Sequence, residues 1–175
     1  LANLRDRELL VERRSSTYSD ETEYAFRHDL VRVATYTMLT DSDKTLGHRL
    51  AANWLETMGQ CDPETLGRHF ELGGVSDHAI RCYLMAAEHA LAGNELQDAM
   101  SCTEAGIRCG ASGETLGRFQ LVRTETRLSD SDIESARESI TEAVSHMNKG
   151  SLAWVRAVGV QGYITLYNLG GPDEG

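Results

Sequence analysis

Proline is scarce in this sequence, with 2 prolines among 175 residues. A proline inside a helix costs about 3 kcal/mol, so its scarcity allows long uninterrupted helices. The sequence also lacks a run of about 18 apolar residues and a secretory signal pattern. We therefore expect a cytoplasmic protein with no membrane partner.

The patterns that bind metals and nucleotides are missing as well. None of the 4 cysteines forms a CxxC pair, and the histidines of the second part are dispersed, with His78 and His89 on one expected helix but 11 residues apart. This argues against zinc and favours reduced thiols. The sequence contains neither GxxxxGK[ST] nor GxGxxG, and neither HRD nor DFG. We expect no metal, no cofactor and no catalytic residue, so that this chain by itself is not an enzyme.

Negative charge is abundant, and it is concentrated in the second part of the chain. Residues 1–60 contain 8 Lys and Arg against 10 Asp and Glu, whereas residues 61–175 contain 9 against 17. An acidic surface repels the phosphate backbone of nucleic acids. Nucleic acid is therefore an unfavourable partner, most clearly for the second part.

Residues 1–60 are expected to be the C-terminal part of a winged-helix-like domain. After a helix tail at 1–8, two short apolar runs flank a polar loop and predict a β-hairpin at about 9–28. Two helices should follow, from Asp29 and after Thr40. Thr40, with Asp43 three residues later, is close to a capping box. Leu46, Leu50, Trp54 and Met58 recur every four residues and predict a buried stripe.

Residues 61–175 alternate between helical patterns and helix breakers. The expected helices lie at about 63–72, 77–92, 95–109, 114–128, 132–147 and 151–169, separated by glycine, asparagine, serine and aspartate. Connections this short make neighbouring helices antiparallel.

Small residues recur in this region with the spacing of the 34-residue tetratricopeptide repeat. One set is Tyr83, Ala86, Ala87, Ala90, Ala99, Thr103 and Gly106, and part of it returns as Ala136, Ile140 and Ala143. A second set of residues fits the same repeat with a different starting point, so the sequence does not decide which helix is the first of each pair. The fold expected is mainly α: a right-handed α-α superhelix of antiparallel helix pairs, tetratricopeptide-like, with a small β-hairpin near the N-terminus.

The best candidate site is an interaction groove. In tetratricopeptide arrays the first helix of each pair lines the concave face. Arg81 and Arg118 are 37 residues apart, and so are Glu88 and Glu125. These four residues are the candidate groove, which would bind a protein or peptide, or another domain of the same polypeptide. Ordinary surface charge on a helix is the alternative explanation.

The two ends of the sequence suggest a piece of a longer polypeptide. The first residue is Leu1, inside a helical pattern, and the turn at Gly170-Gly171-Pro172 comes before any partner for the last helix. The last helix, with Trp154, Val158 and Ile164, would then expose an apolar stripe and favour self-association.

Four segments together resemble a known family: YAFRHDLVRVATYTML, DKTLGHRLAANWLE, RHFELGG and AIRCYLMAAEHAL. They look like bacterial multidomain signal-transduction ATPases, many of which are fused to a serine/threonine protein kinase. In that family the stretch matching Phe26-Arg27-His28 closes the winged-helix part. The resemblance implies a non-catalytic interaction or sensor segment of a kinase–ATPase regulator.

A DNA-binding transcription regulator is the alternative function. Its winged-helix part would contact DNA through Arg5, Arg7, Arg13 and Arg14. Acidic residues lie between these arginines and offset their charge.

Overall fold

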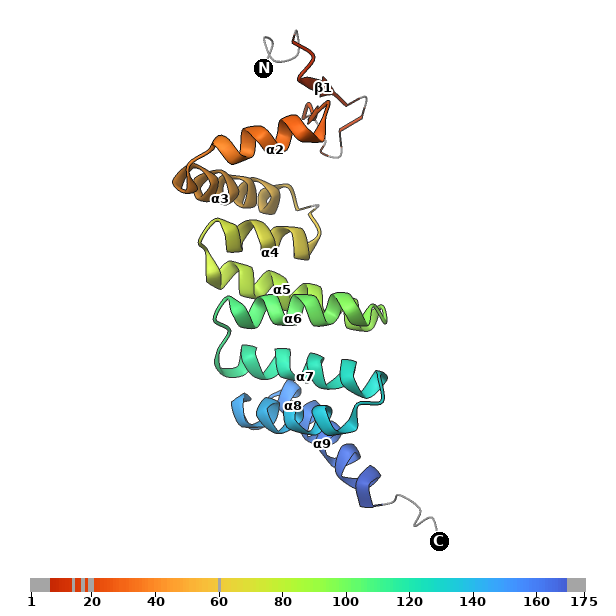
Figure 1. Cartoon of the computed structure of the whole chain (residues 1–175). Coiled ribbons are helices and arrows are strands. Elements are labelled where there is room, and N and C mark those ends of the chain that lie inside the picture. Colours follow the sequence, from red (N-terminus) through yellow and green to blue (C-terminus); the bar gives the residue numbers. More distant parts are fainter. Residues whose placement is uncertain (1–6, 14, 17, 19–20, 60, 170–175) are drawn as a thin grey trace. The chain divides into compact units, whose positions relative to one another are not determined.

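The computed structural model describes residues 7–169, apart from residues 14, 17, 19–20 and 60 and the side chains of 167–169. Within this part the chain forms eight helices and one antiparallel pair of strands (Figure 1). It is therefore mainly helical with a small sheet near the N-terminus, as predicted. The expectations for the helix tail at 1–6, for Arg5 and Arg14, and for the turn at 170–172 lie outside the described residues.

The chain divides into two compact units, which are treated separately below. Unit 1 comprises residues 1–61 and 72–74, and unit 2 comprises residues 62–71 and 75–175. This division falls close to the boundary expected at residue 60. The identity of each part, as a winged-helix remnant and a repeat array, stays a prediction.

Unit 1 begins with the hairpin expected from the two apolar runs. Strand β1 (Leu10–Glu12) pairs antiparallel with strand β2 (Tyr24–Phe26), so that Leu10 lies opposite Phe26. The Arg13 amide extends the ladder by donating a 2.9 Å hydrogen bond to the carbonyl of Glu23. The hairpin prediction is confirmed.

Two helices follow, α2 (Asp29–Met38) and α3 (Asp41–Met58), with the predicted cap between them. The Thr40 hydroxyl accepts a 3.2 Å hydrogen bond from the Asp43 amide. In a full capping box the second side chain would accept from the backbone of the cap residue. The Asp43 carboxylate instead accepts a 2.7 Å hydrogen bond from the Thr40 hydroxyl, because aspartate is one methylene shorter than glutamate.

The buried stripe expected on α3 is wrong. Leu46 is 47% exposed, Leu50 is 60% exposed and Trp54 is 39% exposed, whereas Ala52 is fully buried. The edge of the Tyr18 ring contacts Trp54, with ring centroids 4.7 Å apart. Periodicity correctly identified an apolar face, but it does not say whether another element covers that face.

Unit 2 is a succession of helices, each lying beside the next. The helices of this part of the chain are α4 (Pro63–Leu72), α5 (Ser76–Ala92), α6 (Leu96–Arg108), α7 (Gly113–Ser129), α8 (Ile133–His146) and α9 (Leu152–Leu169). From α5 onward every helix packs against its successor, and α5 also packs against α7. Every boundary lies within one residue of its predicted position, because the breakers that end these helices are visible in the sequence.

Small residues let these helices approach closely. Ala87, Ala99, Ala136 and Ala143 are fully buried, as the repeat pattern predicted for residues at helix crossings. The other members of both repeated sets are buried too: Tyr83, Ala86, Ala90, Thr103, Gly106 and Ile140. Close packing at these positions makes the layers of unit 2 intolerant of added volume.

The tightest crossing joins α6 to α7. A Cβ atom built on Gly106 would lie 2.6 Å from Cε2 of Phe119, whose ring is fully buried. A second crossing joins α7 to the end of α8, where a Cβ on Gly117 would lie 2.7 Å from Cγ of Met147. Glycine is required at both positions because the neighbouring side chain occupies the space of a Cβ.

A buried tyrosine links α5 to α4. The Tyr83 hydroxyl donates a 2.6 Å hydrogen bond to Oε2 of Glu71, whose other oxygen lies 3.7 Å from the Arg108 guanidinium. Burial, together with the Glu71 carboxylate, raises the pKa of Tyr83 well above its usual value. Burial likewise raises the pKa of the Cys102 thiol to about 11, with Glu64, Asp98 and Asp62 adding to the effect.

We expect Gly106→Ala to destabilise unit 2. Added volume in a packed core costs about 1–3 kcal/mol, and the better helix propensity of alanine returns at most about 1 kcal/mol. Gly162→Ala is the matched control, because a Cβ there meets no described atom within 4 Å, and it should raise stability by about 0.5–1 kcal/mol. Urea unfolding of both variants measures the difference. Equal stability of the two variants would contradict the packing at Gly106.

Alkaline pH should destabilise the protein. Tyr83 and Cys102 have raised pKa values in the folded state, so the folded state holds their protons more tightly than the unfolded chain does. Their contribution is complete below the unfolded values of about 8.5 for cysteine and about 10 for tyrosine. The contribution of each group to stability is lost as the pH rises towards and through its pKa in the folded state. The urea midpoint should be constant from pH 7 to 8 and fall above about pH 8.5. In Tyr83→Phe the fall between about pH 9 and 11 should be shallower; an unchanged slope would contradict the assignment.

Candidate functional site

One cavity in unit 2 brings together residues from three helices that alternate along the chain. Its volume is about 590 Å³, and we call it the α5–α7–α9 groove. Its lining residues are Glu88, Leu91 and Ala92 of α5, Glu114, Arg118, Leu121, Val122, Glu125 and Ser129 of α7, and Leu152, Ala153 and Arg156 of α9. Volumes of about 300–1,000 Å³ are typical of ligand pockets.

A forked ion pair joins α5 to α7 at this groove. Nη2 of Arg118 donates hydrogen bonds of 2.6 and 2.8 Å to Oε1 and Oε2 of Glu88, and Nε of Arg118 donates a third, of 3.1 Å, to Oε1. Arg118 is 41% exposed and Glu88 is 39% exposed. A bidentate guanidinium–carboxylate pair fixes direction as well as distance, and it therefore sets how α7 sits along α5 at the groove.

The same arrangement recurs one layer further along the chain. Arg156 of α9 donates a 2.5 Å hydrogen bond to Glu125 of α7, across 31 residues, and Arg118 and Glu88 are 30 residues apart. Each arginine thus binds a glutamate on the preceding helix of the groove. We call the two pairs the ion-pair ladder. Glu125 is its most buried member, at 19% exposure.

An apolar floor lies between the two pairs. Leu121 and Val122 of α7 are 6% and 4% exposed, and Leu91 and Ala153 line the groove beside them. Glu114, which accepts a hydrogen bond from the Asn148 amide, adds a third carboxylate. The groove therefore has an apolar floor and a charged rim with three carboxylates and two guanidinium groups.

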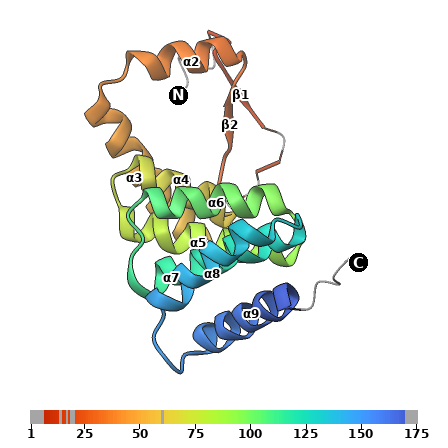
Figure 2. The same ribbon diagram turned by 60° about the horizontal axis from the view of Figure 1, so that its bottom comes forward.

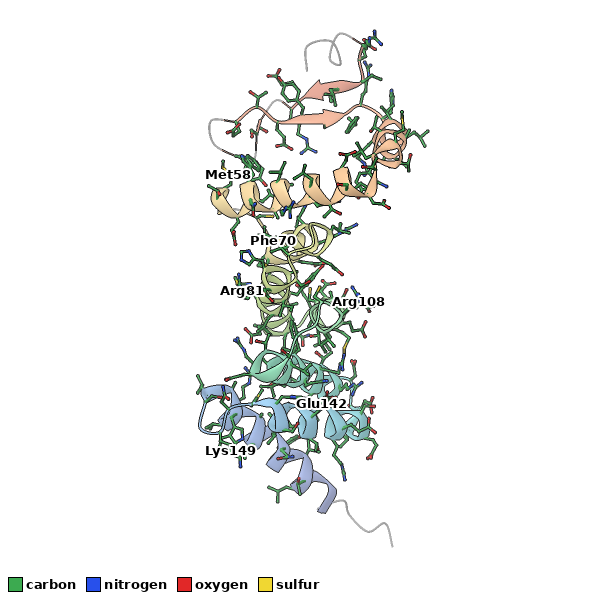
Figure 3. All side chains as sticks on the ribbon, turned by 90° about the vertical axis from the view of Figure 1, so that its left-hand side faces the viewer. Met58, Phe70, Arg81, Arg108, Glu142 and Lys149 are labelled. Atoms are coloured by element: carbon green, nitrogen blue, oxygen red, sulfur yellow. The ribbon has the colours of Figure 1, made fainter. Side chains whose placement is uncertain are left out.

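The structure brings together three of the four residues predicted for a groove. Glu88, Arg118 and Glu125 line one cavity. Arg81 is exposed on α5 and does not belong to the lining residues; Figure 3 shows it on the opposite side of unit 2 from Arg108. A binding role for the four residues stays a prediction.

Sequence reasoning missed Arg156 and Glu114. A signal for Arg156 was present, because it follows Arg118 by 38 residues just as Arg118 follows Arg81 by 37. The arginine at this interval therefore occurs three times, and its third occurrence lies on the last helix. For Glu114 the sequence offers no comparable signal, since its place in the groove depends on how the start of α7 lies beside α9.

Within the described part of the chain, no three His, Cys, Asp or Glu side chains come together as metal ligands. Among the same residues, no helix combines the length and the apolar character that crossing a membrane requires.

Two of the basic residues near the N-terminus of unit 1 pair with acids. Arg13 lies 3.0 Å from Glu23, and Arg27 lies 2.6 Å from Glu8. Arg7 is exposed. Arg5 and Arg14, on which the DNA-binding alternative also rested, lie outside the described residues.

Comparison with protein-family models, with curated proteins and with solved structures finds no match for this chain.

Proposed function

We propose that this chain is a non-catalytic interaction segment of a larger bacterial signalling protein, and that it binds a protein or peptide in the α5–α7–α9 groove. The observation that carries the proposal is the ion-pair ladder, which joins three helices around an apolar floor. Rigid helices that present a few fixed charges around an apolar surface are typical of peptide recognition.

The order of the helices supports a tetratricopeptide-like superhelix. The helices α5, α7 and α9 line the groove. In the sequence, α6 and α8 lie between them, and each packs against both of its neighbours. Alternation of this kind is expected of stacked helix pairs in which the first helix of each pair lines a concave surface. We propose the phase in which α5, α7 and α9 are those first helices.

The resemblance to signal-transduction ATPases supports a context for this groove. We propose that the parent polypeptide is a cytoplasmic serine/threonine kinase–ATPase regulator, in which unit 1 is the end of the winged-helix part. The occupant of the groove is then a partner protein, a peptide or another domain of the same polypeptide.

The charges of the groove suggest the chemistry of its occupant. Three carboxylates face two guanidinium groups, and both guanidinium groups already contact a carboxylate. The chain as a whole has a net charge of −10. The groove therefore favours a segment in which an apolar side chain, for the floor, stands beside a lysine or arginine, for the rim.

Selection from a random peptide display library tests this proposal. We expect the selected peptides to combine an apolar residue with a neighbouring Lys or Arg, and to bind in fluorescence anisotropy with affinity that falls as salt rises. Glu125→Ala removes a rim carboxylate and leaves Arg156 unpaired, so it should weaken binding about 10-fold or more.

Arginine variants provide the matched comparison. Arg118→Ala leaves the Glu88 carboxylate unpaired and should strengthen the binding of a basic segment, whereas Arg81→Ala, a similar change on an exposed part of α5 outside the groove, should leave binding unchanged. Circular dichroism of each variant confirms that it is folded. Failure to enrich any peptide, or equal binding by Arg81→Ala and Arg118→Ala, would overturn the groove as the binding site.

A further inference from the structure

Helix α9 has two apolar faces, one packed and one open. Ala157 is fully buried and Ile164 is 1% exposed, and both belong to the buried cluster formed with α8. The opposite face is formed by Leu152, Val155, Gly159, Gly162, Tyr163 and Leu166, which repeat at intervals of three and four residues. Leu152 is 88% exposed and Leu166 is 69% exposed. We call these six residues the open face; Figure 2 shows α9 as the last helix of unit 2, with α7 and α8 to one side.

The glycines of the open face set it apart from an ordinary solvated surface. A Cβ on Gly159 or Gly162 would meet no described atom within 4 Å. Elsewhere in unit 2, Gly67, Gly106 and Gly117 lie inside helices and receive the side chain of a neighbour. Glycine inside a helix costs about 1 kcal/mol relative to alanine. The open face therefore resembles the packed helix faces of unit 2, because it has large side chains beside glycines that leave room for another helix.

Charge favours a second copy of this chain as the occupant. Residues 152–169 contain one charged side chain, Arg156, whereas the chain has a net charge of −10. Two copies repel each other over most of their surface, and this repulsion is smallest where carboxylates are lacking. Arg156 itself is held by Glu125, at the border of the open face.

The open face is also complementary to itself. When two α9 helices lie antiparallel about a two-fold axis at Gly159, Leu152 meets Leu166 and Val155 meets Tyr163. Gly159 then faces Gly159 at the point where the helices are closest. In the same register Gly162 meets Arg156, so no carboxylate enters the pairing. Each residue i that contacts residue j of the second copy is matched by j contacting i, as in an isologous interface.

We propose that two copies of this chain form a dimer through antiparallel pairing of their α9 helices, with Gly159 at the crossing. The proposal does not rest on the peptide groove, but the two surfaces share Leu152, which lines the groove and also belongs to the open face. Interfaces below about 1,200 Å² of total buried area belong to weak and transient complexes. Two single helices bury less than this, so the dimer should dissociate on dilution.

Sedimentation equilibrium from about 1 µM to about 300 µM, with a reducing agent to keep the cysteines free, measures the association. We expect wild-type protein to shift from monomer towards dimer across this range. Gly159→Glu should raise the dimer dissociation constant at least about 10-fold, because it places two carboxylates at the crossing. The variant should remain folded, because its side chain points into open space and glutamate has a higher helix propensity than glycine.

Gly47→Glu is the matched control. Gly47 also lies inside a helix, α3 of unit 1, and a Cβ there also meets no described atom within 4 Å. The substitution makes the same change of charge at a residue that does not belong to the open face, and it should leave the dissociation constant unchanged. A wild-type chain that stays monomeric at the highest concentration would overturn the proposal. A dimer that Gly47→Glu weakens as much as Gly159→Glu would overturn it too.

Discussion

The arrangement of unit 2 depends on how closely α6 and α7 approach each other at Gly106. The ring of Phe119 fills the space that a Cβ of residue 106 would occupy, and this ring is fully buried. Any other residue at 106 would push the helices apart or force the ring out of its site. Because α7 also contacts α5 and α8, its position at this crossing sets the positions of its neighbours, and through them the shape of the groove.

The groove shows how such packing and the charged side chains work together. Close packing brings α5, α7 and α9 around one apolar floor, and the ion-pair ladder then fixes how each helix lies along the preceding one. Half-exposed ion pairs contribute little to stability, usually less than about 1 kcal/mol. Their value here is directional, because a forked contact such as that of Arg118 with Glu88 has one good geometry. The small residues hold the layers together, and the forked pair favours one position of α7 along α5.

The sequence was sufficient for the helix boundaries and for the small residues at the crossings. Glycine and polar breakers mark the ends of the helices, and Ala99 and Ala136 lie at the same point of a repeated pattern. The sequence failed where burial depends on another element: the stripe with Leu50 and Trp54 has the right period but is exposed. The repeated 37-residue spacing in the sequence also indicated Arg118 and Glu88 as candidate groove residues. Their pairing with each other, and that of Glu125 with Arg156, depends on the spacing between helices, which local patterns do not contain.

Nuclear magnetic resonance of the Gly106 α-protons tests the central packing most directly. With the Phe119 ring directly against Gly106, these protons should show strong nuclear Overhauser effects to the ring, and their resonances should shift upfield by roughly 0.5–1 ppm through its ring current. Both signals should be lost in Phe119→Leu. Gly106 protons at ordinary helical positions, with no contact to the ring, would contradict the crossing on which the layers of unit 2 depend.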